Sequence, residues 1–195
     1  KEKFFRHFLM NWKRKKVWSS FDIVYSSNHK AHVVKLDNRL YLTRSGKVLK
    51  IPNAKLAKKV AREWEKITVD FSQTNLPVTN ILEQIQEVDK KLSETYLREI
   101  LEYANTDLIC YRVQTPEGLK KLQDKRWDPI LEIYYEKYGI ELVKTYGVTH
   151  VMQDKDSMKK FCNILDSYNP QKRFIVYKIT HLLGSALLSI LIEKK

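Results

Sequence analysis

The chain has 195 residues, of which 43% are hydrophobic and 11% aromatic, with five glycines and five prolines. This composition is typical of a globular protein and excludes low-complexity and collagen-like chains. Cys110 and Cys162 are the only cysteines, which is too few for a disulfide framework and fits a reducing compartment. The length allows one large domain or two small ones.

The net charge of +13 is concentrated in the first part of the chain. Residues 1–75 hold 18 Lys and Arg against 6 Asp and Glu, whereas residues 76–195 hold 18 against 17. A basic region can indicate that the partner is nucleic acid, an acidic membrane surface or an acidic protein. Because no nucleic-acid motif or stacking platform accompanies the charge, nucleic-acid binding is kept only as an alternative function.

Residues 1–16 form a basic N-terminal segment with seven Lys or Arg, one Glu and several aromatic residues between them. An amphipathic, acid-poor start of this kind is typical of a mitochondrial targeting stretch or its remnant. It also suits a basic surface helix that leads into the first strand, and both interpretations stay open.

Residues 17–72 are expected to form a small β-rich domain with one covering helix. The expected elements are strands at 21–25, 32–36, 39–43 and 47–51, a turn at Asp37-Asn38, and a helix from Ala54 to about Lys66. Asn53 can cap that helix, whose apolar face covers the sheet. The polar connection that follows marks the expected domain boundary.

Residues 77–195 are expected to form a larger, all-helical domain, because apolar residues there recur every three to four positions. The expected helices lie at 81–88, 92–103, 119–138, 154–168 and 174–192, with a short extended segment at 142–148. The apolar run 174–192 could just span a bilayer, but Lys178 and His181 within it favour a buried core helix. The sequence therefore predicts an α+β protein of two domains.

The helix expected at 119–138 carries both an apolar stripe and a proline. The stripe comprises Leu119, Leu122, Trp127, Ile130, Leu131, Tyr134 and Tyr138. Pro129 lies inside it, so the helix is expected to kink or restart there, with Asp128 placed to cap the restart.

No sequence motif for a nucleotide, a metal or a catalytic nucleophile is found. The five histidines are scattered, and Cys110 between apolar neighbours has the context of a packed thiol. The sequence therefore predicts no cofactor, no metal and no enzymatic activity. An enzyme that uses Asp107, Cys110 or Asp128 is kept as a further alternative.

Two motifs carry a resemblance to a known family. Thr106-Asp-Leu-Ile-Cys-Tyr-Arg112, followed by Trp127-Asp-Pro-Ile-Leu131, resembles the central signature of the ATP synthase assembly chaperones that bind the α subunit of the catalytic head. Val34-Lys-Leu-Asp-Asn-Arg39 and Ala61-Arg-Glu-Trp64 are similar to the family's N-terminal region. The chain departs from the family at Arg44, where a proline is usual, and at Asn80, where an arginine is usual.

The resemblance implies an ATP-independent chaperone of the mitochondrial matrix, or of the bacterial cytoplasm if the source is an α-proteobacterium. It would bind the free ATP synthase α subunit as a monomer, would not span a membrane, and would cover the face destined for the β subunit. The implied client-binding residues are Glu63, Trp64, Asp107, Tyr111, Arg112, Trp127 and Asp128.

A structural interpretation of these residues stands beside the functional one. Asp107 can cap a helix, Arg112 can pair with one acid, and Asp128 can cap the restarted helix. The functional interpretation places the same three side chains in a polar cluster at the junction of the two domains, against the client. Trp64 and Trp127 also suit a hydrophobic core.

Overall fold

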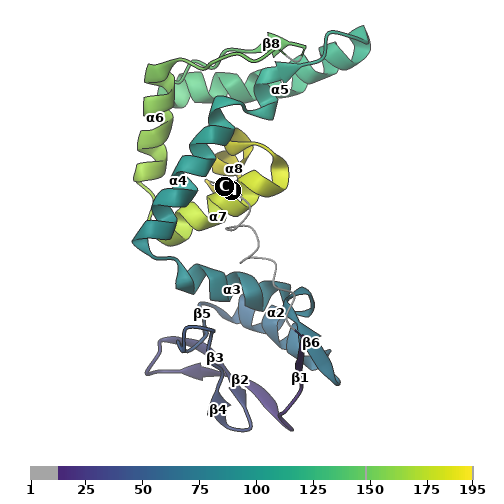
Figure 1. Ribbon diagram of the computed structural model, residues 1–195, viewed down its shortest axis with the longest axis vertical. Coiled ribbons are helices and arrows are strands. Elements are labelled where there is room, and N and C mark those ends of the chain that lie inside the picture. The colour runs from purple at the N-terminus through teal and green to yellow at the C-terminus, as the bar shows by residue number, and fades with distance from the viewer. Residues whose placement is uncertain (1–12, 148, 195) are drawn as a thin grey trace. The chain divides into compact units, whose positions relative to one another are not determined.

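The structure is a computed structural model that describes residues 13–147 and 149–194 (Figure 1). The chain divides into two compact units, residues 1–87 and 88–195. A small sheet region in the first unit and helices in the second confirm the predicted α+β class. The basic segment expected at 1–16 lies mostly outside the described residues, of which Lys13–Lys15 form strand β1.

The first unit is built around one central strand. Its strands are β1 (Lys13–Lys15), β2 (Phe21–Ser26), β3 (Ala31–Leu36), β4 (Arg39–Leu40), β5 (Lys50–Ile51) and β6 (Asp70–Ser72). β3 pairs antiparallel with β2 along one side and with β4 and β5 in turn along the other, while β1 pairs with β6. The predicted Asp37-Asn38 turn is confirmed, with both residues at positive φ as tight hairpin turns require.

The two strands expected at 39–43 and 47–51 are shorter than the sequence suggested. Only Arg39–Leu40 and Lys50–Ile51 are strands, with an isolated bridge between Leu42 and Val48. The turn between them contains Gly46 at φ 80°. Both short strands pair with β3, where β4 lies opposite Lys35 and Leu36 and β5 lies opposite His32 and Val33.

Two helices cover the sheet of the first unit. In α2 (Ala54–Glu65) the predicted cap is confirmed, because the Asn53 side chain accepts a hydrogen bond from the Leu56 amide. A 3₁₀ turn, η1 (Gln73–Asn75), leads into α3 (Pro77–Glu87).

Helix α3 is tied to the sheet region by side chains of its C-terminal half. The Tyr41 hydroxyl donates to Glu83 at 2.6 Å, and the Lys50 amide donates to Gln86 at 3.0 Å. Glu87 accepts from Thr43 at 2.8 Å. The first unit therefore extends to residue 87, whereas the sequence placed the boundary after residue 72 and assigned this helix to the second domain.

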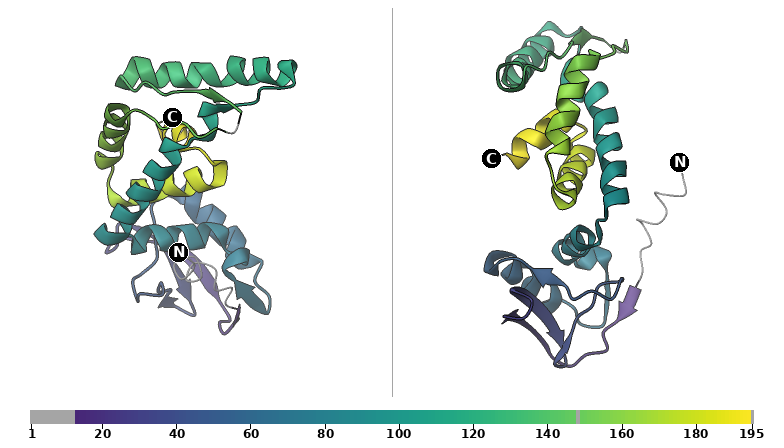
Figure 2. Two further views of the ribbon diagram at one scale, coloured as in Figure 1. Left: turned by 45° about the horizontal axis from the view of Figure 1, so that its top comes forward. Right: turned by 90° about the vertical axis from the view of Figure 1, so that its left-hand side faces the viewer.

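The second unit is helical apart from one short parallel strand pair. Its elements are α4 (Lys90–Asn105), η2 (Leu108–Cys110), β7 (Tyr111–Arg112), α5 (Glu117–Tyr138), β8 (Thr145–Tyr146), α6 (Lys155–Asp166), α7 (Pro170–Leu183) and α8 (Ala186–Glu193). Helix α4 packs on α7, α7 on α8, and α5 lies beside β8 (Figures 1 and 2). The fully buried side chains at its centre include Ile100, Tyr134, Phe161, Leu165, Leu187 and Ile190.

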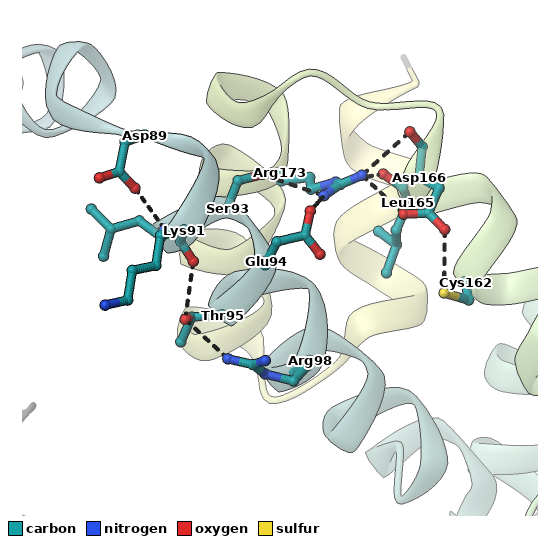
Figure 3. Close-up of polar contacts among 11 residues, drawn as sticks. Asp89, Lys91, Ser93, Glu94, Thr95, Arg98, Cys162, Leu165, Asp166 and Arg173 are labelled. Carbon is teal, nitrogen blue, oxygen red and sulfur yellow. Dashed lines mark hydrogen bonds and ion pairs between the residues drawn. The ribbon is translucent and has the colours of Figure 1, made fainter.

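A buried arginine joins three of these helices (Figure 3). Arg173 of α7 is 7% exposed, and its Nε donates to the Leu165 carbonyl at 2.8 Å. Its terminal nitrogens pair with Glu94 of α4 at 3.2 Å and Asp166 of α6 at 3.0 Å. A buried guanidinium is tolerated when its donors are satisfied in this way. Sequence reasoning did not single out Arg173, because one arginine beside other polar residues at the start of an apolar run carries no spacing signal.

The long apolar run near the end of the chain is two helices, so the single helix expected at 174–192 is wrong. Gly184 at φ 70° is the left-handed cap of α7, and its amide donates to the Thr180 carbonyl. Ser185 then caps α8 by accepting from the Leu188 amide at 3.1 Å. Over residues 13–147 and 149–194, no helix is both long and apolar enough to cross a membrane.

The Gly184 cap generates a prediction with a matched control. Gly184→Ala should lower the free energy of unfolding by about 1–2 kcal/mol, because a Cβ disfavours positive φ although no neighbouring atom crowds the site. Gly118→Ala, in the first turn of α5 with equally open surroundings, should raise it by about 0.5–1 kcal/mol. Urea unfolding monitored by circular dichroism measures both, and equal effects of the two substitutions would contradict the assignment.

Candidate functional site

The seven predicted client-binding residues fall into two groups, one in each unit. Glu63 and Trp64 lie on α2 of the first unit. The other five surround the short strand β7 in the second unit, and they are Asp107, Tyr111, Arg112, Trp127 and Asp128.

Glu63 and Trp64 together fix the start of α3. The Glu63 carboxylate accepts hydrogen bonds from the amides of Val78 at 2.5 Å and Thr79 at 3.0 Å, so it satisfies amides that the helix leaves unpaired. It also accepts from the Thr79 hydroxyl at 2.8 Å, and that hydroxyl in turn accepts from the Trp64 indole at 3.1 Å. The buried Trp64 ring, 2% exposed, packs against aromatic rings that include Tyr41 at 4.9 Å and Trp18 at 5.4 Å.

The second group is organised by the Arg112 guanidinium, whose side chain is fully buried. Its Nε lies 3.3 Å from Asp124, and one terminal nitrogen lies 3.0 Å from Asp128. The other terminal nitrogen donates to the Ile109 carbonyl, and the guanidinium carbon lies 4.8 Å from the centre of the Trp127 ring. The sequence expected one acidic partner for Arg112, and the structure provides two from successive turns of α5.

Asp128 does not cap a restarted helix, so that prediction is wrong. Helix α5 continues from Glu117 to Tyr138 with Pro129 inside it, and no new helix begins at residue 129. The Asp128 carboxylate instead bridges Arg112 at 3.0 Å and Lys144 at 2.8 Å. Burial opposes its ionisation, but the hydrogen bonds from Lys144 and Arg112 and their positive charges outweigh this and lower the Asp128 pKa.

Asp107 joins two segments that are distant in sequence. Its buried carboxylate caps η2 by accepting from the Ile109 amide at 3.0 Å, which confirms its predicted role as a cap. Its other oxygen accepts from the Leu187 amide at 3.0 Å, in the first turn of α8. Burial raises the Asp107 pKa against these hydrogen bonds. The Tyr134 hydroxyl donates to the Leu187 carbonyl at 2.8 Å, so α5 and α8 meet at the same place.

Tyr111 and Trp127 are the aromatic members of the second group, and both are half-buried. Tyr111 pairs with Thr145 in the parallel β7–β8 ladder, and its hydroxyl lies 3.3 Å from the Nδ1 atom of the exposed His150. Trp127 packs against the Arg112 guanidinium from α5. Sequence reasoning missed Asp124 and Lys144, although the four-residue spacing of Asp124 and Asp128 places both carboxylates on one helix face.

The chemistry of the second group favours a structural framework over a reactive centre. Burial, with a smaller effect from Asp107, raises the pKa of the Cys110 thiol to about 12, so it stays protonated at neutral pH. The Arg112 guanidinium and the carboxylates of Asp107 and Asp128 already have partners within the unit. Among the residues that the structure describes, no group of three or more His, Cys, Asp or Glu is placed to hold a metal ion.

The ion pairs of Arg112 predict that removing its charge lowers the free energy of unfolding far more than removing the charge of Lys144. Arg112→Met should lower the free energy of unfolding of the second unit by roughly 3–5 kcal/mol, because it leaves two carboxylates and the Ile109 carbonyl without their shared donor. Lys144→Met removes only the outer, partly exposed partner of Asp128 and should cost about 0–1 kcal/mol. Urea titrations of both variants test this difference, and a near-neutral Arg112→Met would contradict the central role of the guanidinium.

The lowered pKa of Asp128 predicts a pH dependence with a definite sign. Its ionised form is favoured in the folded state, so its contribution to stability is present above the ordinary Asp pKa of 3.8 and is lost as the pH falls through the lower, folded-state value. Asp128→Asn should be less stable than the wild type near neutral pH and approach it in acid. Melting temperatures from about pH 7 down to about pH 3 check this, and parallel curves would refute it.

Comparisons with known proteins place this architecture in a family. A model of the ATP12 chaperone protein family matches residues 15–135. This range contains most of the β-rich unit and also Arg112, Asp124 and Asp128 of the second unit. The mitochondrial protein atp12 of Schizosaccharomyces pombe is 26% identical over 149 residues, covering 70% of this chain and 51% of that protein.

Solved structures agree with this match. The crystal structure of Atp12 from Paracoccus denitrificans is 25% identical with a TM-score of 0.76, covering 91% of this chain and 76% of that one. A protein of Agrobacterium tumefaciens, 24% identical with a TM-score of 0.75 and covering 91% and 66%, supports the fold alone. The chain spans about half the length of the curated relative. Because the family model covers more than half of the chain, the chain belongs to the ATP12 chaperone protein family.

Proposed function

We propose that the chain is an ATP-independent assembly chaperone of the ATP synthase. It binds the unassembled α subunit and shields the face that contacts other subunits until the β subunit replaces it. The observation that carries this proposal is the family match over residues 15–135, which includes both groups of signature residues. The client itself is inferred from the resemblance of the Thr106–Arg112 and Trp127–Leu131 motifs.

The physical requirement for such a chaperone is modest. An unassembled subunit of a ring exposes a large apolar interface, which would otherwise bind to other copies and aggregate. A chaperone has to bind that face with moderate affinity. The permanent partner subunit, which buries more surface, can then displace the chaperone. This exchange needs neither nucleotide hydrolysis nor a catalytic residue, so a framework of fully paired polar residues suits it.

Under this proposal, the seven predicted client-binding residues have two roles, which depend on how exposed each side chain is. Trp64, Asp107 and Arg112 are buried and would act on the client only by fixing the shape of the surface. Glu63, Tyr111, Trp127 and Asp128 are half-buried, so part of each side chain reaches solvent and could contact the client directly.

We place the protein in the mitochondrial matrix, or in the bacterial cytoplasm if its source is α-proteobacterial, and expect it to act as a monomer. Support for the mitochondrial location comes from the Schizosaccharomyces pombe relative, which is a mitochondrial protein.

The test is suppression of aggregation of the isolated ATP synthase α subunit. On dilution from denaturant without ATP, light scattering by the α subunit should fall in proportion to added chain, and added β subunit should displace the chain into free solution. Lysozyme serves as the control for a basic protein that is not a chaperone. Scattering that is unchanged by the chain, or suppressed equally by lysozyme, would refute the proposal.

A further inference from the structure

The first half of α5 exposes two apolar side chains of the stripe that the sequence predicts. Leu119 is 42% exposed and Leu122 is 51% exposed. Further along the same helix, Ile130, Leu131 and Tyr134 belong to or pack against the core of the second unit as expected. The stripe is therefore buried only in its second half. Figure 1 shows the N-terminal end of α5 reaching past α4, α7 and α8 of the same unit.

Polar contacts determine which side of this half-helix faces the unit. Asp124 and Asp128 turn toward Arg112, and Gln123 accepts a hydrogen bond from the Val113 amide at 2.8 Å. Lys120 lies over the Tyr146 ring at 4.9 Å. At 100° per residue, Leu122 lies roughly opposite these side chains and Leu119 lies at the edge of that outer side. The ion pairs of Arg112 thus hold the two leucines toward solvent.

Positive charge surrounds the two leucines. Lys121, Lys125 and Arg126 are exposed, and none of them forms a salt bridge with a carboxylate in the described part of the chain. The α5 face is defined here as Leu119, Leu122 and these three basic residues. Such a face complements an apolar protein surface flanked by acidic side chains.

We propose that the α5 face is the surface that docks the client protein, and that it takes a patch of apolar side chains flanked by Asp or Glu. This inference rests on the proposed function and names the chaperone surface that performs it. The two leucines supply the apolar contact, and the lysines and arginine select the acidic margin. Because the ion pairs of Arg112 hold α5 in place, we expect this helix to lose little conformational freedom when the client binds.

The observations favour a protein partner over nucleic acid or a membrane. Phosphate binding would use the basic residues but would leave Leu119 and Leu122 without a role, and the nearest aromatic residue of α5, Trp127, faces the Arg112 side. Two leucines also give a narrow apolar stripe compared with that of a helix that lies in a membrane surface.

The apolar arm of the test compares two double substitutions in the full chain. Leu119→Ser with Leu122→Ser should weaken α-subunit binding about tenfold or more, measured by calorimetry and by suppression of aggregation. Leu182→Ser with Ile192→Ser, at sites 83% and 49% exposed in the same unit, is the matched control and should leave binding unchanged. Melting temperatures of both variants should stay at the wild-type value, since all four side chains are exposed.

The charged arm reverses two charges at matched sites. Lys121→Glu with Lys125→Glu should weaken binding about tenfold, whereas Lys55→Glu with Lys59→Glu, on the exposed side of α2, should leave it unchanged. Because both variants change the net charge equally, a loss of binding in both would indicate a general charge effect and would overturn the inference.

The outcomes separate the two proposals. If the wild type fails to bind the α subunit, the proposed function fails and the α5 inference fails with it. If the wild type binds and the α5 variants bind equally well, only the α5 inference is overturned. Two further results would reassign the face and overturn the inference. One is a wild-type dimer that the α5 variants disperse, and the other is salt-sensitive binding of a single-stranded oligonucleotide that they abolish.

Discussion

The arrangement of the second unit depends on one buried guanidinium. Arg112 lies on a strand of two residues, which has too few backbone hydrogen bonds to fix its own position. Its ion pairs with Asp124 and Asp128 attach that strand to two successive turns of α5. Asp128 also pairs with Lys144, which lies next to β8. Because a buried charge is costly without partners, this network tolerates little displacement of Arg112 or of its two carboxylate partners. The orientation of α5, and hence the side that it shows to solvent, follows from it.

In the first unit, the position of a helix is fixed by a carboxylate and an indole instead of a guanidinium. There the Glu63 carboxylate and the Trp64 indole meet at Thr79, so neighbouring residues of α2 fix the first turn of α3. Trp64 also lies at the centre of the aromatic cluster beneath the sheet. The two adjacent residues therefore connect the core of the unit to its last helix. Both groups of signature residues act first on the position of a helix, and only through it on a surface.

Sequence reasoning succeeded where a local pattern carries the information. The Asp37-Asn38 turn, the Asn53 cap and the Asp107 cap each depend on residues within a few positions, and each was predicted correctly. It failed at Asp128, because the competing partners Arg112 and Lys144 come from other elements that no helix pattern reveals.

The same limit explains two further differences. Helical periodicity identified α3 but could not show that Glu83 and Glu87 bind the sheet and place the helix in the first unit. The break at Gly184 was hidden by the apolar run around it, although a glycine followed by serine is a common end and start of two helices. Long-range polar contacts, rather than the apolar pattern, therefore account for most of what the sequence did not reveal.

The contact between Asp107 and Leu187 has a consequence for how the protein folds during its synthesis. Its carboxylate accepts from Leu187, a separation of 80 residues, and Arg173 contacts Ser93 across the same interval. Both contacts lie within the second unit, so that unit cannot complete its polar framework until nearly all of its chain has been synthesised. The first unit, residues 1–87, contains its own core and can close earlier. We therefore expect the β-rich unit to fold before the helical one, because the Asp107 carboxylate has its full set of partners only after α8 has been synthesised.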